Sequence, residues 1–251
     1  MAAVKLHIRL AHVESGLRSF KLMMPEEHNR VLTDHCADLL FCPTQTAIAN
    51  LAKGGIEHGV YFVGDTMYDA ILHFAEMSCQ KSSLQSALGL TPKKYILATI
   101  HRPLNTDSIE NLHNIFSSLT ETNEVVILPL HPRTRAAMVR MNITILKYPN
   151  IKVVDPQGYL EMLMLEQNSR MIVTDSGGIQ KEAYLLGIRC ITLREETEWV
   201  ETVEAGWNCL TGADSSKIAT RFHDFNPQGS RPDIYGDGHA ADKIIEILKT
   251  S

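Results

Sequence analysis

Two hydrophobic patterns alternate along the chain from Lys94 onward. Short, continuous apolar runs occupy residues 95–99, 125–128, 151–154, 171–174, 190–193 and 208–210. Apolar residues three or four positions apart occupy the intervening segments 108–120, 134–141, 159–167, 179–186 and 200–205. The short runs predict buried strands, and the longer spacing predicts helices with one apolar face. Strands that alternate with helices predict an α/β fold with a parallel, doubly wound sheet.

The first 70 residues carry fewer elements. Their pattern predicts helices at 25–37 and 44–53, strands at 38–42 and 60–63, and a helix that begins at 67 and ends at 77. An independent domain usually has about 100 residues, so this segment predicts only part of a domain. We therefore expect three regions: a partial domain at 1–70, a larger domain at 71–228, and a tail at 229–251. The tail predicts an amphipathic helix at 240–250 that returns to cover the N-terminal part.

Composition narrows the class of protein. Of the 251 residues, 44% are hydrophobic and 21% are charged, which fits a soluble globular protein. A net charge of −5 without a Lys/Arg run argues against a nucleic-acid partner. The five cysteines are scattered and never form a C-x-x-C pair, which favours a reducing cytoplasm over disulfides or a zinc site. No apolar run has the length of a membrane span, so we predict a cytoplasmic protein.

Residues 171–182 indicate a phosphate-binding turn. A predicted strand ends before Ser176, Gly177 and Gly178 allow close approach of the backbone, and a helix follows. The N-terminus of a helix offers unpaired N–H groups and a positive dipole end, which suit a phosphate. Glu182 lies one turn past Gly178, where its carboxylate can accept hydrogen bonds from a ribose diol. A serine N-cap followed by a flexible turn explains the segment about equally well.

Polar residues also follow the predicted strands of the larger domain. His101, His131, Asp155 and Ser176 all lie where such strands end, and ligands of doubly wound sheets bind beyond these ends. Each residue alone also has a structural explanation. A histidine at a strand end is often an ordinary loop residue.

Two acidic segments precede that domain. Glu14 lies in a short glycine-containing segment, and Glu26 with Glu27 starts the helix at 25–37. Taken singly, Glu26 and Glu27 fit surface acids that favour the helix dipole, and Glu14 fits a solvated side chain.

Eight motifs occur in a fixed order along the chain. They are HVESGLR at 12–18, PEEHNR at 25–30, VGDTMYDA at 63–70, IHR at 100–102, PLHP at 129–132, VDPQGY at 154–159, DSGGIQKE at 175–182 and LREETE at 193–198. From about residue 11 to residue 212, this order resembles the non-hydrolysing UDP-N-acetylglucosamine 2-epimerase family. The resemblance implies two Rossmann-like domains of the GT-B type, of which the N-terminal one is incomplete here, with a UDP-sugar between them.

The resemblance also implies an activity and its residues. Family members convert UDP-N-acetylglucosamine to UDP-N-acetylmannosamine by eliminating UDP and adding it back through a 2-acetamidoglucal, as a step toward cell-surface polysaccharides. By resemblance, the catalytic residues are Glu14, Glu26 and His101. The substrate-binding residues are Arg102, His131, Ser176, Gly177, Gly178 and Glu182. In bacterial members, the positions of Arg102 and His131 also help to bind a second UDP-sugar as activator.

We predict no cofactor and no metal. Epimerisation through transient oxidation would need a dinucleotide, but no G-x-G-x-x-G follows any predicted strand. No cluster of metal ligands stands out, and elimination of UDP does not require a metal ion. The remaining chemistry needs a carboxylate acid/base pair near C2 and groups that stabilise the departing diphosphate.

The chain departs from the family in two places. Family members begin with a complete first half, which holds an arginine for UDP and a catalytic aspartate. We therefore expect the isolated chain to bind UDP weakly, to have little or no activity, and to form a homodimer or join a chain that supplies that half. The loop after His101 and residues 196–201 resemble instead the branch that acts on UDP-2,3-diacetamido-2,3-dideoxyglucuronic acid.

Three alternatives to the main interpretation follow from the sequence. The second epimerase branch is one of them. A GT-B glycosyltransferase would share the fold and the UDP half-site, but the Glu14 and Glu26 pair weighs against it. A non-catalytic UDP-sugar-binding subunit would also bind UDP, without turnover.

Overall fold

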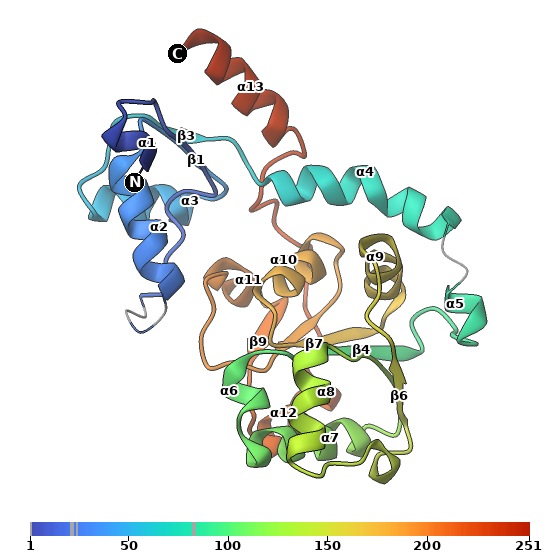
Figure 1. Ribbon diagram of the computed structural model, residues 1–251. Coiled ribbons are helices and arrows are strands. Elements are labelled where there is room, and N and C mark those ends of the chain that lie inside the picture. The colour runs from blue at the N-terminus through green and yellow to red at the C-terminus, as the bar shows by residue number, and fades with distance from the viewer. Residues whose placement is uncertain (1, 21–22, 24, 82–83) are drawn as a thin grey trace. The chain divides into compact units, whose positions relative to one another are not determined.

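The computed structural model describes residues 2–20, 23, 25–81 and 84–251. The side chains of residues 79–81, Cys79 included, lie outside this description, as does Met24, which precedes the second acidic segment. The chain divides into two compact units. Unit 1 comprises Met1–Leu72 and Pro232–Ser251, and unit 2 comprises His73–Arg231. Each unit holds one parallel sheet, which confirms the predicted α/β class (Figure 1).

Unit 1 is built on a three-stranded parallel sheet in the order β1-β2-β3. Its strands are β1 (Ala11–Val13), β2 (Leu39–Cys42) and β3 (Val60–Phe62). Its helices are α1 (Ala2–Lys5), α2 (Pro25–Cys36), α3 (Gln45–Lys53), the start of α4 (Thr66–Lys81), and α13 (Ala240–Thr250). The central strand β2 is buried along its whole length, because all four of its residues are apolar and both faces are covered.

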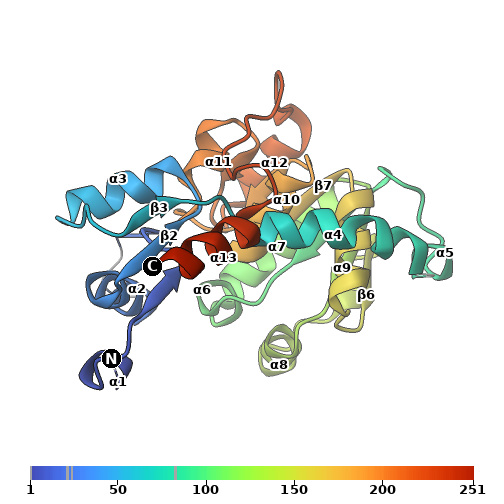
Figure 2. The ribbon, with the colours of Figure 1, turned by 90° about the horizontal axis from the view of Figure 1, so that it is seen from above.

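The C-terminal helix α13 completes the core of unit 1. Ile244 and the partly buried Ile247 pack with Leu39, Phe41 and Val63 of the sheet, and Figure 2 shows α13 beside these strands. The Asp69 carboxylate of α4 accepts hydrogen bonds from the first two amides of α13, at 3.1 and 2.7 Å. Unit 1 is therefore assembled from both ends of the chain.

Unit 2 is built on a six-stranded parallel sheet in the order β6-β5-β4-β7-β8-β9. The strands are β4 (Tyr95–Thr99), β5 (Val125–Pro129), β6 (Ile151–Val154), β7 (Met171–Thr174), β8 (Cys190–Thr192) and β9 (Asn208–Leu210). The strand order reverses between β4 and β7, so the crossover helices fall on opposite faces. All six strands were predicted from their apolar runs.

Helices cover both faces of this sheet. They are α5 (Leu84–Ala87), α6 (Pro103–Thr106), α7 (Ile109–Glu121), α8 (Pro132–Arg140), α9 (Tyr159–Asn168), α10 (Gly177–Leu185), α11 (Val200–Glu204) and α12 (Ser215–Asp224), with a 3-10 turn at Ile145–Lys147. Alternate residues of β4 point to opposite faces. Ile96 and Ala98 pack with α7, α8 and α12, whereas Tyr95 and Leu97 pack with α9 and α10.

The structure adds elements that the pattern did not predict. Strand β1 was missed because it has three residues and sits at the edge of its sheet. Helix α12 was missed because it buries only Ile218 and Phe222, although Asp214 caps its N-terminus by accepting from Lys217 N at 3.0 Å. Among the described residues, no helix combines the length and the apolar character that a membrane span needs.

Candidate functional site

Four polar residues of unit 2 lie one or two positions beyond the ends of parallel strands, as predicted. His101 follows the end of β4, His131 follows β5, Asp155 follows β6, and Ser176 follows β7. Because β4 and β7 are neighbours in the sheet, His101 and Ser176 come from the two strands at which the strand order reverses. This point is where doubly wound sheets place their ligands.

Buried Asp175 links these two strand ends. Its carboxylate accepts hydrogen bonds from the backbone N–H of His101 at 2.9 Å, from that of Arg102 at 2.9 Å, and from Asn105 Nδ2 at 3.0 Å. The side chain of Asp175 is fully buried. The loop after β4 is thereby fixed to the start of the Gly-Gly turn after β7. The sequence interpretation assigned no role to Asp175, although an acid placed directly after a buried strand was a usable signal.

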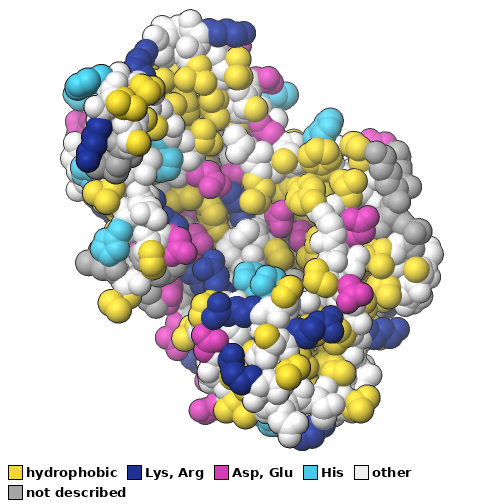
Figure 3. All heavy atoms as spheres, viewed as in Figure 1, with side chains coloured by type: hydrophobic (Ala, Val, Ile, Leu, Met, Phe, Trp, Pro, Cys, Tyr) yellow, Lys and Arg dark blue, Asp and Glu magenta, His cyan; other side chains and the backbone are white. Residues whose placement is uncertain are grey.

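The surroundings of His101 favour its neutral form. Its Nδ1 lies 3.5 Å from Asp175 Oδ1, and its ring centroid lies 5.2 Å from that of His131. Burial lowers the pKa of His101, and the nearby charges of His131, Arg102 and Arg133 lower it further, against the opposing effect of Asp175. A neutral imidazole can donate a hydrogen bond from one ring nitrogen and accept with the other. Figure 3 shows histidine side chains with Lys and Arg side chains around them over α6 and α8.

The structure also places Arg102 and His131 beside His101. His131 is exposed and caps α8, because its Nδ1 accepts from Arg133 N at 3.1 Å. The Nε of Arg102 is buried, and within the described part of the chain it has no hydrogen-bond partner. Arg102 thus belongs to the loop that Asp175 fixes, and His131 contacts that loop through the ring of His101.

Helix α10 begins at Gly177, and Ser176 is its N-cap residue. The Ser176 side chain makes no capping hydrogen bond, and its own amide donates to Thr174 Oγ1 at 2.9 Å. The first amides of a helix have no partner within it, so those of Gly177 and Gly178 are oriented to receive an anion. The predicted helix began two residues later, at Ile179, because a glycine pair was interpreted as a turn.

The surroundings of Gly177 leave no room for a side chain at this position. A Cβ atom at this position would lie 2.5 Å from Oε1 of Glu198, whose carboxylate pairs with Arg194 at 3.0 Å. A Cβ atom at Gly178 would lie no closer than 3.9 Å to its nearest neighbour, Ser176 Oγ. The two adjacent glycines are therefore constrained differently.

Glu182 lies on α10 and is hydrogen-bonded to Glu166 of α9. Burial raises the pKa of Glu182, although the charge of Lys181 and the hydrogen bond from Glu166 oppose the shift. Sequence reasoning did not identify Glu166, because nothing local to α9 marks a buried glutamate as a partner of another helix.

The two predicted acids lie in unit 1, whereas the other predicted site residues lie in unit 2. Glu14 is exposed and has a left-handed backbone conformation with φ of 64°. Glu26 is exposed in the first turn of α2. Its neighbour Glu27 is buried and accepts hydrogen bonds from the Ser19 and Phe20 amides at 3.0 and 3.1 Å. Glu27 therefore has a structural role and is not a surface acid, because it caps the amides of the preceding segment from a buried position.

A buried aspartate fixes the segment that carries Glu14. Asp34 of α2 accepts hydrogen bonds from His12 Nδ1 at 2.6 Å, Arg18 Nη1 at 2.6 Å and Gly16 N at 3.2 Å. Burial alone would raise the pKa of Asp34, but the hydrogen bonds and charges of His12 and Arg18 lower it below its ordinary value. Sequence reasoning missed Asp34, because its partners lie 16 to 22 residues away.

Comparison with known proteins decides the family. The family described as UDP-N-acetylglucosamine 2-epimerase matches residues 1–249. The chain belongs to this family. A UDP-N-acetylglucosamine 2-epimerase homolog of Methanococcus maripaludis is 49% identical over 99% of this chain and 71% of its own length. The UDP-2,3-diacetamido-2,3-dideoxy-D-glucuronate 2-epimerase of Pseudomonas aeruginosa is 44% identical over 99% of this chain and 70% of its own length.

Solved structures of family members have the same fold. The UDP-GlcNAc 2-epimerase of Methanocaldococcus jannaschii, crystallised in complex with UDP-GlcNAc and UDP, has a TM-score of 0.91 at 40% identity. The match covers 99% of this chain and 71% of that one. The enzyme of Neisseria meningitidis bound to UDP-GlcNAc has a TM-score of 0.89 at 31% identity, over 100% of this chain and 72% of that one. The predicted GT-B type of fold is therefore confirmed.

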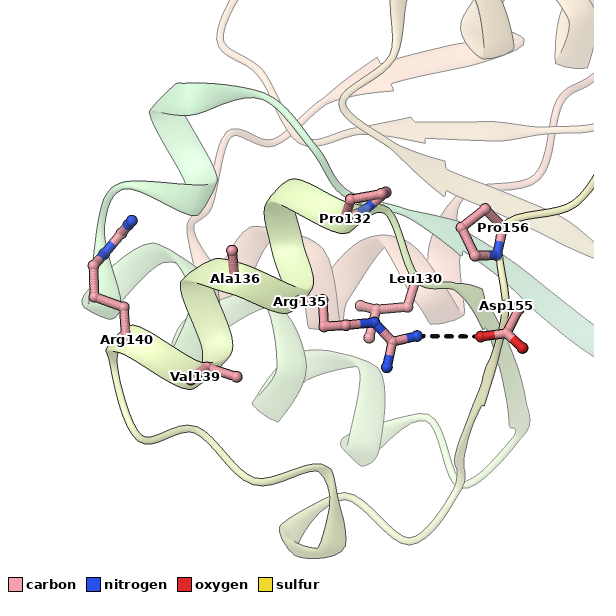
Figure 4. Close-up of a pocket in the computed structure, with 8 residues that line it drawn as sticks. All are labelled: Leu130, Pro132, Arg135, Ala136, Val139, Arg140, Asp155 and Pro156. Atoms are coloured by element: carbon pink, nitrogen blue, oxygen red, sulfur yellow. Dashed lines mark hydrogen bonds and ion pairs between the residues drawn. The ribbon is translucent and has the colours of Figure 1, made fainter.

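A separate pocket of this 2-epimerase family member lies beside α8 and has a volume of about 800 Å³ (Figure 4). Its lining residues are Leu130, Pro132, Arg135, Ala136, Val139, Arg140, Asp155 and Pro156. Arg135 points across it to Asp155, with 3.3 Å between Nη2 and Oδ1. We assign no role in UDP-sugar recognition to this pocket, because none of the predicted catalytic or substrate-binding residues lines it. Asp155 thus follows its strand as expected but faces this pocket.

Proposed function

We propose that this chain binds a UDP-sugar and epimerises UDP-N-acetylglucosamine at C2, by eliminating UDP and adding it back through a 2-acetamidoglucal. One observation carries the proposal. The N-terminus of α10, where the Ser176 side chain makes no capping hydrogen bond, lies where the strand order reverses, and buried Asp175 fixes the loop of His101 to it. That arrangement suits a diphosphate, because amide dipoles and a hydrogen-bond donor meet at one place.

The proposed residues of unit 2 bind the diphosphate and the ribose of the UDP-sugar. The amides of Gly177 and Gly178 receive the diphosphate, and His101 donates a hydrogen bond to it as the C1–O bond breaks. Glu182 accepts hydrogen bonds from the ribose diol. Arg102 and His131 belong to the same binding surface, where the unpartnered Nε of Arg102 supports a role toward an anion.

Glu14 and Glu26 are proposed as the acid/base pair at C2. No neighbouring carbonyl acidifies the C2 proton of the sugar, so its removal requires a carboxylate base while UDP departs from C1. Return of UDP to the glycal then requires a proton delivered to the opposite face of C2. The exposure of both glutamates supports this role, because a base must reach its substrate.

A second substrate remains a candidate. The Pseudomonas aeruginosa relative, at 44% identity, is named as a UDP-2,3-diacetamido-2,3-dideoxy-D-glucuronate 2-epimerase. Supplying both sugars in parallel tests this point, and turnover of the charged sugar alone would select the second branch.

The decisive experiment combines nucleotide binding with hydrogen exchange at C2. Calorimetry should detect UDP binding, and UDP-N-acetylglucosamine incubated with the chain in D2O should acquire deuterium at C2. Glu14→Gln and Glu26→Gln should abolish exchange and leave the affinity for UDP within about twofold. UDP binding without exchange would favour the non-catalytic subunit, and absence of UDP binding would refute the proposal as a whole.

We also propose that the chain associates through unit 1, as a homodimer or with a second chain. Strand β1 is an edge of its sheet, and parallel edges tend to be covered or paired. Sedimentation equilibrium measures the association directly. The cytoplasmic location and the role in cell-surface polysaccharide synthesis stay predictions.

A further inference from the structure

Helices α9 and α10 bring two carboxyl groups together inside unit 2. The helices lie side by side on one face of the sheet (Figure 1), where Leu165 and Ala183 share a core cluster. Glu166 of α9 is 1% exposed, and its side chain is hydrogen-bonded to that of Glu182. Among the described residues, no N–H or hydroxyl group reaches Oε2 of Glu166. The partner of this buried carboxyl is therefore another acid.

A hydrogen bond between two carboxyl groups requires a proton on one of them. Burial disfavours the charged form of Glu166, and the charge of Glu182 disfavours it further, so the pKa of Glu166 lies well above its ordinary value. Lys181 favours the charged form of Glu182. The proton therefore resides on Glu166, which donates, and the Glu182 carboxylate accepts.

Three neighbouring groups with a raised pKa stay neutral while the pair titrates. Tyr159 begins α9, Tyr95 comes from β4, and Cys190 comes from β8. Burial, with the charges of Glu182 and Glu166, raises the pKa of Tyr159 to about 12. Burial also raises the pKa of Tyr95 and of Cys190. Lys181 is buried, with its Nζ 4.3 Å from the ring centroid of Trp199.

We propose that Glu166 is a positioning residue, which donates its proton to Glu182 and holds that carboxylate in the orientation that accepts a ribose diol. This inference rests on the proposed binding of a UDP-sugar. Only one of the three protonation states of the pair suits the ribose. With two protons, Glu182 loses its charge, and with none, the two carboxylates repel and the orientation is lost.

Two substitutions of Glu166 distinguish the effect of its hydrogen bond from the effect of its side-chain volume. Glu166→Gln retains a donor toward Glu182 but does not titrate, whereas Glu166→Leu retains apolar bulk without a donor. Glu161→Gln, on the same helix α9, is the matched control because Glu161 is only partly buried and is not paired with Glu182 in this way. Thermal unfolding of each full-length variant establishes that it folds.

The experiment compares the dissociation constants of UDP and of 2′,3′-dideoxy-UDP by calorimetry, between about pH 5 and about pH 9. We expect Glu166→Leu to weaken UDP by about tenfold and to leave the dideoxy nucleotide unchanged. The affinity of the wild type for UDP should fall at alkaline pH, where the pair loses its proton. Glu166→Gln should keep the affinity for UDP within about threefold and should not show this fall. The control variant should behave as the wild type with both nucleotides.

The outcomes distinguish this inference from the proposed function. If the wild-type chain binds neither nucleotide, the proposed function fails. If it prefers UDP but Glu166→Leu leaves that preference intact, the positioning role is wrong. Equal weakening of both nucleotides would assign Glu166 a purely structural role and overturn the inference. If Glu166→Leu does not fold, the pH dependence of Glu166→Gln decides the question. A loss of UDP affinity at alkaline pH as large as that of the wild type would overturn the inference.

Discussion

At the scale of single residues, the two adjacent glycines at the start of α10 differ in whether they leave room for a methyl group. A methyl group at Gly177 meets the Glu198 carboxylate, which Arg194 holds in place, whereas one at Gly178 meets nothing closer than an ordinary contact. Gly177→Ala should therefore lower the free energy of unfolding by about 1 to 3 kcal/mol, the usual cost of overpacking. Gly178→Ala should change it by less than about 1 kcal/mol, because alanine also favours the helix.

Urea unfolding of the two glycine variants tests this difference. The added methyl group would also stand beside the amides that are proposed to receive the diphosphate, so Gly177→Ala should weaken UDP binding. Equal stability of Gly177→Ala and Gly178→Ala would show that Glu198 moves aside without cost, and the steric argument would be wrong.

The contribution of Asp34 to the free energy of unfolding depends on pH. Its three hydrogen-bond donors include Arg18, whose side chain is 7% exposed, so removal of the acid leaves a buried charge unpaired. Asp34→Asn should cost roughly 3 kcal/mol near neutral pH, in the range found for broken buried pairs. Glu57→Gln, an exposed acid in the same unit, is the control and should cost almost nothing.

The sign of the pH dependence follows from the lowered pKa of Asp34. Below its unfolded pKa of 3.8, the unfolded chain binds a proton that the folded chain does not yet bind. The stabilisation is therefore complete above that pH and is lost as the pH falls through the lower folded pKa. The difference in unfolding free energy between wild type and Asp34→Asn should shrink on acidification. A difference that stays constant would mean that the Asp34 carboxylate is not the source.

At the scale of elements, the sequence predicted most of the fold because the signals were local. Each strand of unit 2 is a buried apolar run, and burial on both faces makes such runs visible without any tertiary information. Strand β1 is a three-residue edge strand, and its pairing with β2 decides its conformation. Helix α12 shows only two buried apolar residues, so its capping aspartate was the stronger signal.

The positions of several candidate site residues were visible for the same reason, and their roles stay predictions. The Gly-Gly turn and the strand-end histidines were visible from short motifs. The roles of Asp175 and Glu166 were not assigned, because they arise from contacts with His101, 74 residues away, and with a glutamate on another helix. Residues such as these, which orient other residues, owe their roles to tertiary packing. A single sequence does not show that packing.

At the scale of the whole molecule, the two units differ in how the chain builds them. Unit 2 is continuous in sequence, whereas unit 1 requires the last twenty residues of the chain to complete its core. Helix α13 reaches that core through Ile244, and Asp69 caps its first turn. The stability of unit 1 should therefore respond to substitutions in α13, far in sequence from its strands.

Ile244→Ala and Ile245→Ala test this dependence on adjacent positions of one helix. Ile244 is 8% exposed and Ile245 is 50% exposed, so only the first leaves a cavity. Ile244→Ala should cost about 2 to 4 kcal/mol, and Ile245→Ala less than about 1 kcal/mol. Hydrogen exchange should then quicken at the amides of β2 and stay unchanged in β4, because the lost contacts lie within unit 1. If exchange quickened equally in both sheets, the two units would unfold as one, and α13 would stabilise the chain as a whole.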